Sequence, residues 1–272
     1  MRYDLVAGVR FSLIPLASIV ALCVVLFAGV YGYASFFHID VSDLSSSDVF
    51  GLVLAGATRF EWRPGMLIRL PLGWMALMGF VLYASLTYPA FDMRASGGRS
   101  LLAVGYRRTW LLSKMLWVCF ATIAAVVAIV AVSLVISCAL SMPLGLEIHD
   151  AALRLCMVSA DSIALRESCI VPFLLAVMAS LVAIAELQLM ISLFIHPVLA
   201  FGACMAYLVI GYFIQSPLLL GNGAMLSRWG GAVSTGVAPH EITAVAAMMC
   251  AVVCIGGMWA IGKIDIYEKG AE

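Results

Sequence analysis

Apolar residues gather along the chain in six long stretches, separated by short segments that carry nearly every charge. A helix that rises 1.5 Å per residue needs roughly 20 apolar residues to cross the hydrocarbon of a bilayer. The pattern therefore predicts an all-α integral membrane protein with six transmembrane helices and a single transmembrane domain over residues 1–272. The spans are expected at about 11–33, 66–89, 115–140, 169–193, 198–216 and 240–262.

Composition agrees with this pattern. Hydrophobic residues make up 64% of the chain and charged residues 11%, against about 25% charged in an average soluble domain. The formal net charge is zero, so nothing indicates a nucleic-acid partner. The apolar run from Phe11 to Tyr33 is longer than the core of a secretory signal, and we interpret it as an uncleaved first span.

The distribution of basic residues predicts the orientation in the membrane. With both termini placed in the cytoplasm, nine of the 15 Lys and Arg residues lie inside and six lie outside. The inside set is Arg2, Arg10, Arg94, Arg99, Arg107, Arg108, Lys114, Lys263 and Lys269, and the outside set is Arg59, Arg63, Arg69, Arg154, Arg166 and Arg228. The positive-inside rule therefore favours cytoplasmic N- and C-termini.

The inner loop between the second and third spans, residues 94–114, carries most of that bias. Leu102, Tyr106 and Trp110 recur at four-residue steps, which predicts one face of a short helix. The basic residues around that face are Arg99, Arg107, Arg108 and Lys114. Such a helix suits docking into a groove of a cytoplasmic partner or contact with anionic lipid, and a third alternative is that its charges only set the topology.

Glu186 is the one acidic residue that we place inside a span. An ionisable group in the membrane is expensive, which makes Glu186 a functional candidate. Two alternatives stand: a structural or interfacial role near the inner end of the fourth span, and contact with a substrate or gate. The second role makes Glu186 a candidate for the substrate path.

The outer segments carry weaker signals. The apolar run Val49 to Ala57 is too short to span, and we expect it at the interface or packed against the second span. His149 to Arg166 suits a short amphipathic helix over the outer end, and the Gly-rich residues 217–239 suit an irregular loop. Cys156 and Cys169 lie in or beside the second outer loop, either as free thiols or as a disulfide.

No motif for catalysis or metal binding stands out in the sequence. Residues 257–264 come close to the phosphate-binding loop, but Ile264 replaces the Ser or Thr that contacts magnesium, and the segment lies in the last span. Cys250 and Cys254 share a helical face without His or carboxylate nearby in the sequence. We expect no enzyme activity, no bound metal and no cofactor in this chain.

Three stretches together resemble the ABC-2 type permease subunits of bacterial ABC transporters. They are the loop from Gly105 to Lys114, the turn from Ser192 to Pro197 and the tail from Gly262 to Lys269, within the six-span layout. The resemblance implies a permease subunit in the bacterial plasma membrane, most often an exporter of peptides, drugs or lipid-like substrates. It also implies two separate cytoplasmic ATPase subunits that hold ATP and magnesium, and a second permease, identical or homologous.

By the same resemblance, residues 99–114 form the element that couples ATPase closure to the spans. The coupling candidates are Arg99, Leu102, Tyr106, Arg107, Arg108, Trp110 and Lys114. Two rival interpretations stay open: a non-transporting immunity or sensor subunit that binds a ligand at its outer loops, and an ion-coupled secondary transporter that uses Glu186.

Overall fold

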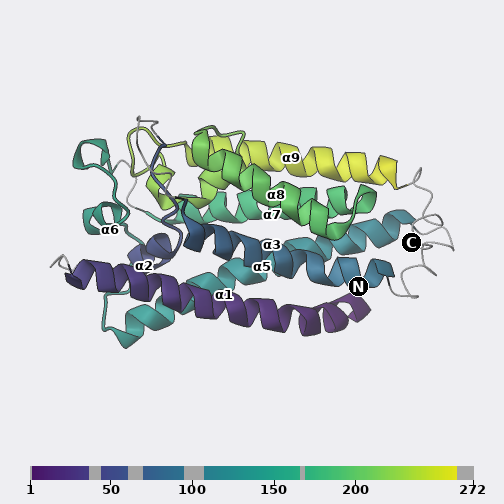
Figure 1. Ribbon diagram of the computed structural model, residues 1–272, viewed down its shortest axis with the longest axis horizontal. Helices are drawn as coiled ribbons and strands as arrows, with labels where there is room; N and C mark the ends of the chain where they lie inside the picture. Colours follow the sequence, from purple (N-terminus) through teal and green to yellow (C-terminus); the bar gives the residue numbers. More distant parts are fainter. Residues whose placement is uncertain (1, 37–43, 61–69, 95–106, 166–168, 262–272) are drawn as a thin grey trace.

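Six long helices run side by side along the long axis of the protein (Figure 1). The computed structural model describes residues 2–36, 44–60, 70–94, 107–165 and 169–261. The long helices are α1 (Arg2–Phe36), α3 (Leu72–Arg94), α5 (Arg107–Ala139), α7 (Val171–Phe194), α8 (Pro197–Phe213) and α9 (Pro239–Ala260). The N-terminus and the end of α9 lie at one end of the bundle, here called the inner end, and α2 and α6 lie at the other, the outer end.

Five of these helices are long and apolar enough to cross a membrane, which is the architecture of a membrane protein. The exception is α8, which has only 17 residues. At 1.5 Å per residue, α8 is about 25 Å long, slightly short of the roughly 30 Å hydrocarbon core. The all-α prediction is thus confirmed for the described residues, and five of the six predicted spans correspond to helices that are long and apolar enough to cross a membrane.

Several helix boundaries differ from the sequence prediction: α1 begins at Arg2 rather than at 11, α3 begins at Leu72 rather than at 66, and α8 ends at Phe213 rather than at 216. The third span, expected at 115–140, belongs to a helix that begins at Arg107. Trp110 and Lys114, expected in the inner loop, are instead buried in its first two turns. The second span, expected to end at Pro89, continues to Arg94, because a proline in a membrane helix is tolerated when neighbouring helices compensate for the lost backbone bond.

The centre of the bundle is α7, which packs against α3, α5, α8 and α9. Small side chains at Ala176, Ser180 and Ala183 are buried there, and small residues let helix backbones approach closely in lipid. By contrast, α1 and α9 are the least buried of the five candidate spans. Their exposed faces carry large apolar residues such as Ile14 and Ile255, as expected for lipid contact.

The predicted tight turn between the fourth and fifth spans is confirmed. Only Ile195 and His196 separate α7 from α8, and α8 begins at Pro197. Proline suits a first helical turn because its missing N–H would have no partner there. The ring Nδ1 of His196 accepts a hydrogen bond from the backbone N–H of Val198 at 3.3 Å and so caps α8.

The outer end is built on a short, wholly buried helix, α2 (Ser46–Val53). It packs mainly against α5, α1 and α6, whereas we expected it at the interface or against the second span. The carboxylate of Asp48 is fully buried and accepts bonds from the backbone N–H of Ser45 and of His149, both at 2.8 Å. The Nδ1 of His149 lies 2.6 Å from the same carboxylate, so Asp48 joins the two predicted outer segments.

The helix expected over residues 149–166 is present in part. It consists of α6 (Asp150–Leu155) and, after a turn, the 3-10 helix η1 (Ala160–Ser162). Met157 adopts a positive φ of 60° between them, which ends the regular helix. The amphipathic pattern therefore predicted the place of a helix correctly but not its length.

The third outer segment is irregular, as predicted, yet it inserts into the bundle. Residues 220–229, here called the inserted segment, are all buried and contain the 3-10 helices η2 (Leu220–Ala224) and η3 (Leu226–Arg228). The indole Nε1 of Trp74 in α3 donates to the carbonyl of Ala224 at 2.7 Å, and the N–H of Leu226 donates to the carbonyl of Leu54 at 2.9 Å. Since η2 packs against α7, α8 and α9, the inserted segment fills the space among their outer ends.

Candidate functional site

The inner ends of α3 and α5 are joined by a buried ion pair. The Lys114 ammonium lies 2.9 Å from the Asp92 carboxylate and 3.1 Å from the Tyr88 hydroxyl. It also lies 4.3 Å from the centre of the Tyr88 ring, a cation–π contact. The indole Nε1 of Trp110 donates to the same Asp92 oxygen at 3.0 Å. We call these four residues, Tyr88, Asp92, Trp110 and Lys114, the inner clasp.

Two of the predicted coupling residues belong to the inner clasp and are buried rather than exposed. Trp110 and Lys114 were expected on the surface of a docking helix, but their exposed fractions are 5% and 1%. Arg108 is exposed and Arg107 half-buried at the start of α5. Arg99, Leu102 and Tyr106 lie outside the described residues. The coupling role itself stays a prediction, with Arg107 and Arg108 as its surface residues and the inner clasp as the joint behind them.

Glu186 lies inside the bundle, where α7 faces α5. Its carboxylate Oε1 accepts a bond from the Cys119 thiol at 3.2 Å, and its Oε2 has no hydrogen-bond partner among the described residues. Both amide atoms of the nearby Gln188 also lack partners in the described part of the chain. Since the Glu186 side chain is 2% exposed and lines none of the cavities described below, its role in a substrate path stays a prediction.

At the outer end, Arg228 is the most heavily bonded buried side chain of the inserted segment. Its guanidinium donates to the carbonyls of Ala57 (2.8 Å), Thr58 (3.1 Å), Gly211 (2.6 Å) and Tyr212 (2.6 Å), and to the Asn222 side chain at 2.5 Å. Gly211 and Tyr212 belong to the last turn of α8, whose carbonyls have no partner within the helix. The cation also faces the negative end of the α8 dipole.

The charge of Arg228 persists despite burial. Desolvation lowers the pKa of Arg228 to about 10, and the neighbouring Tyr212 opposes this shift. The guanidinium is therefore cationic at physiological pH. Five hydrogen bonds to dipolar oxygens replace its lost hydration, which a buried cation requires.

Sequence reasoning placed Arg228 in an outer loop and gave it no role, although a signal was present. It is the only Asp, Glu, Lys or Arg between Glu186 and Glu241. A single charge in such a long apolar stretch has to reach water or be surrounded by acceptors. In the structure, Arg228 is surrounded by hydrogen-bond acceptors.

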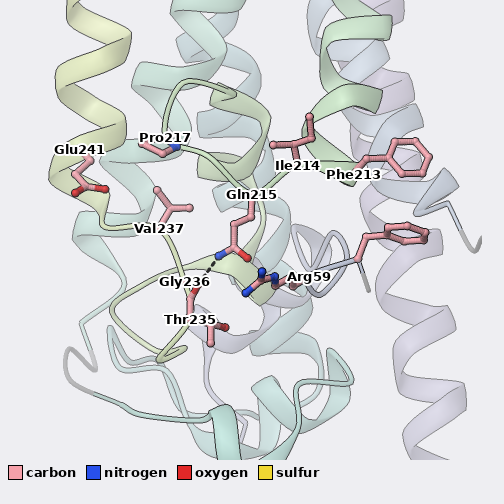
Figure 2. A pocket seen from close by; sticks show the side chains of 10 residues that line it. Arg59, Phe213, Ile214, Gln215, Pro217, Thr235, Gly236, Val237 and Glu241 are labelled. Carbon is pink, nitrogen blue, oxygen red and sulfur yellow. Dashed lines mark hydrogen bonds between the residues drawn. The ribbon is translucent and has the colours of Figure 1, made fainter. Parts of the chain in front are cut away.

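Next to Arg228, the outer end contains an open cavity of about 490 Å³ (Figure 2). It lies between the end of α8, the start of α9 and residues 59–60. The lining residues are Arg59, Phe60, Phe213, Ile214, Gln215, Pro217, Thr235, Gly236, Val237 and Glu241. Arg59 and Glu241 are both exposed and give the cavity one cationic and one anionic group.

A second cavity, of about 520 Å³, lies near the inner end and is almost entirely apolar. It is lined by Phe11 of α1, by Tyr83 and Phe91 of α3, and by Val198 and Phe201 of α8, among others. The rings of Phe11 and Phe91 pack there at a tilt of 36°, with their centres 4.6 Å apart. Its position among membrane helices fits contact with lipid chains.

The cysteines support neither a disulfide nor a metal site in the described part of the chain. Cys156 and Cys169 are free thiols. Burial, with the Asp48 carboxylate as a second cause, raises the pKa of the Cys156 thiol to about 12, whereas Cys169 is exposed. No group of three or more His, Cys, Asp or Glu residues suited to a metal ion occurs among the described residues.

Comparison with models of protein families, with curated proteins and with solved structures finds no match for this chain.

Proposed function

We propose that the chain is the permease subunit of an ABC transporter with six spans, both termini in the cytoplasm and α8 as the fifth span. The alternation of helix ends along the bundle supports this orientation, because the end of α3, the start of α5 and the turn at 195–196 lie at the end where α1 begins. The excess of Lys and Arg in those inner segments supports the same orientation. The proposed membrane is the bacterial plasma membrane.

The inner clasp is the observation that carries this proposal. It ties the last turn of α3 to the second turn of α5 through Asp92 and Lys114. A force applied to the loop that joins these helices therefore moves both of them together. Arg108 presents a cation beside that loop, where an acidic groove of a cytoplasmic partner would engage it.

The energy source belongs to that partner. The near-match to a phosphate loop at residues 257–264 lacks the magnesium-binding hydroxyl, so we assign ATP and magnesium to separate ATPase subunits. Nucleotide-driven closure of these subunits would shift the population of outward-open states. A second permease copy or a homologous permease completes the path, and the proposed cargo is a peptide, a drug or a lipid-like molecule leaving the cell.

Co-purification from native membranes tests this proposal. The wild-type chain should bring down a protein that hydrolyses ATP, and the double variant R107E/R108E should lose that protein while the chain still inserts. The matched variant R107K/R108K keeps both charges and should retain the partner, as should R154E, which reverses an exposed arginine at the outer end. Recovery of the ATPase with R107E/R108E, or its absence from the wild-type sample, would contradict the proposal.

Two rival functions rest on other observations. The outer cavity, with its one cationic and one anionic residue, favours a sensor or immunity subunit that binds a ligand without transporting it. The Oε2 of Glu186, which has no hydrogen-bond partner within the described ranges, favours an ion-coupled secondary transporter. Loss of gradient-driven uptake in a Glu186→Gln variant, with no nucleotide dependence, would support the transporter over the permease.

A further inference from the structure

The outer cavity has the features of a built binding site for a molecule that carries both charges. Arg59 lies on one side of the cavity and Glu241 on the opposite side, with Gln215 between them (Figure 2). Neither Arg59 nor Glu241 has an ion-pair partner among the residues that the structure describes. The cavity therefore offers a cation and an anion that are both available to a ligand.

A third polar group completes the lining. The side-chain N–H of Gln215 donates to the carbonyl of Thr235, which fixes the amide in place. Its Oε1 is then buried and has no hydrogen-bond partner among the described residues. A fixed acceptor in this lining offers a further polar contact to a ligand that carries N–H donors.

One wall of the cavity is aromatic, and its rings come from two segments, residue 60 and the end of α8. Phe60 lies with its ring centre 5.2 Å from that of Phe213, in an edge-on arrangement, and 5.6 Å from that of Tyr212. Such a wall packs against methylene groups, and its ring faces also attract cations. In Figure 2 Phe213 lies on the side of Arg59 away from Glu241, so this wall suits an apolar part of the ligand next to its anionic group.

Arg228 lies outside the cavity lining and fixes the backbone of two segments that form it. It binds the carbonyls of Ala57 and Thr58, which precede Arg59 and Phe60, and those of Gly211 and Tyr212, which precede Phe213. The two lining segments come from distant parts of the sequence, yet one buried side chain fixes both. A site held in place by such bonds loses little conformational entropy when a ligand binds.

We infer that this cavity binds a small zwitterion, with its phosphate or carboxylate on Arg59 and its ammonium on Glu241. The guanidinium fork matches a phosphate or carboxylate in a bidentate manner. The same zwitterion exists as the headgroup of phosphatidylethanolamine and as a free molecule. The inference does not depend on an ATPase partner, so it stands apart from the proposed permease function.

Binding measurements on the full chain in lipid nanodiscs test the inference. The free probe is glycerophosphoethanolamine, titrated calorimetrically into discs made of phosphatidylcholine, and the anionic comparison is glycerophosphate. The lipid probe is phosphatidylethanolamine, measured by native mass spectrometry as lipid retained against phosphatidylglycerol. Saturable binding of the zwitterion, with at least tenfold weaker binding of its anionic counterpart, is expected in one or both arms.

The charged residues provide the variants. R59Q and E241Q should each weaken zwitterion binding about tenfold, the effect of one lost charged hydrogen bond. R154Q and D161N remove exposed charges at the same end of the protein but outside the cavity, and should leave binding unchanged. All four side chains are exposed, so the variants should fold like the wild type, with thermal stability as the check.

The charge swap R59E/E241R identifies the source of the ligand. A free zwitterion can turn around and should bind the swapped cavity within about threefold of the wild type. A lipid headgroup is fixed by its acyl chains and should not recover. Absence of saturable zwitterion binding in both arms, equal binding of the anionic probes, or an effect of R154Q and D161N as large as that of R59Q and E241Q would overturn the inference.

Discussion

The Arg228 guanidinium donates a 2.5 Å hydrogen bond to the Asn222 side-chain oxygen, and the Asn222 amide nitrogen donates in turn to the carbonyls of Ile214 and Ser216. Asn222 therefore relays the contact of Arg228 to the chain that leaves α8. Together the two side chains fix the inserted segment to the end of α8. This pair holds the outer end in the conformation described here.

Replacement of Arg228 should strongly destabilise the protein. Arg228→Ala leaves four backbone carbonyls and the Asn222 oxygen without their donor, which predicts a loss of about 3 kcal/mol or more. Arg228→Lys should recover only part of it, because a single ammonium cannot reach all five acceptors. Thermal unfolding in detergent measures both effects, with R154A as the exposed control. A change in unfolding temperature no larger than that of R154A would contradict the assigned role.

The inner clasp should show strong coupling between its two charges. Asp92→Asn or Lys114→Met alone leaves one buried ion without its partner, and each should destabilise the protein by about 3 kcal/mol. The double variant D92N/K114M removes both charges and should be less destabilised than the sum of the single variants. A thermal double-mutant cycle measures this difference. Additive effects would show that Asp92 and Lys114 do not act as a pair.

The inserted segment should tolerate no side chain at Gly223. A Cβ built there lies 2.5 Å from Ile242 and 2.6 Å from the Ser180 hydroxyl, so Gly223→Ala forces the segment away from α7 and α9. Gly202→Ala in α8 is the matched control, since a Cβ there meets nothing within 4 Å and alanine favours a helix. Hydrogen exchange should increase in residues 220–229 for the first variant only. Equal protection in both variants would contradict the packing.

The two thiols of the second outer segment should react differently. A membrane-impermeant maleimide added to intact cells at pH 7.5 should label Cys169, which is exposed. Cys156 should label far more slowly, because its pKa of about 12 keeps it protonated at that pH. In a Cys138→Ser background, which removes the exposed thiol in the last turn of α5, Cys156→Ser should therefore leave the labelling almost unchanged, and Cys169→Ser should remove most of it. Labelling of Cys169 only after the cells are opened would reverse the proposed orientation.

The long helices could be predicted because a helix that crosses a bilayer needs about 20 apolar residues in a row, and such runs are visible in the sequence. The start of α5 could not be predicted in this way. Polar and aromatic residues from Arg107 to Lys114 resemble a separate surface helix, yet Asp92 neutralises Lys114 and accepts from Trp110, so the same residues are buried. That partner lies 18 and 22 residues upstream, in a different helix.

In the candidate sites too, local sequence features were predictable and long-range contacts were not. Glu186 was found because a single acid in an apolar span stands out, and the structure confirms its burial. Arg228 and the outer cavity were missed because their contacts join residues 57–58, 211–212 and 222, which no local pattern connects. Long-range hydrogen bonds to backbone carbonyls leave no trace in the identity of the acceptor residues.

The unequal lengths of the helices have a consequence for the surrounding bilayer. At 33 residues, α5 is about 50 Å long, whereas the 17 residues of α8 reach about 25 Å. A flat bilayer of one thickness cannot match both lengths. We therefore expect either that the lipid beside α8 thins by about 5 Å, or that α7 and α8 tilt less than the neighbouring helices. The stability of the protein should consequently vary with acyl-chain length, with an optimum in thinner membranes.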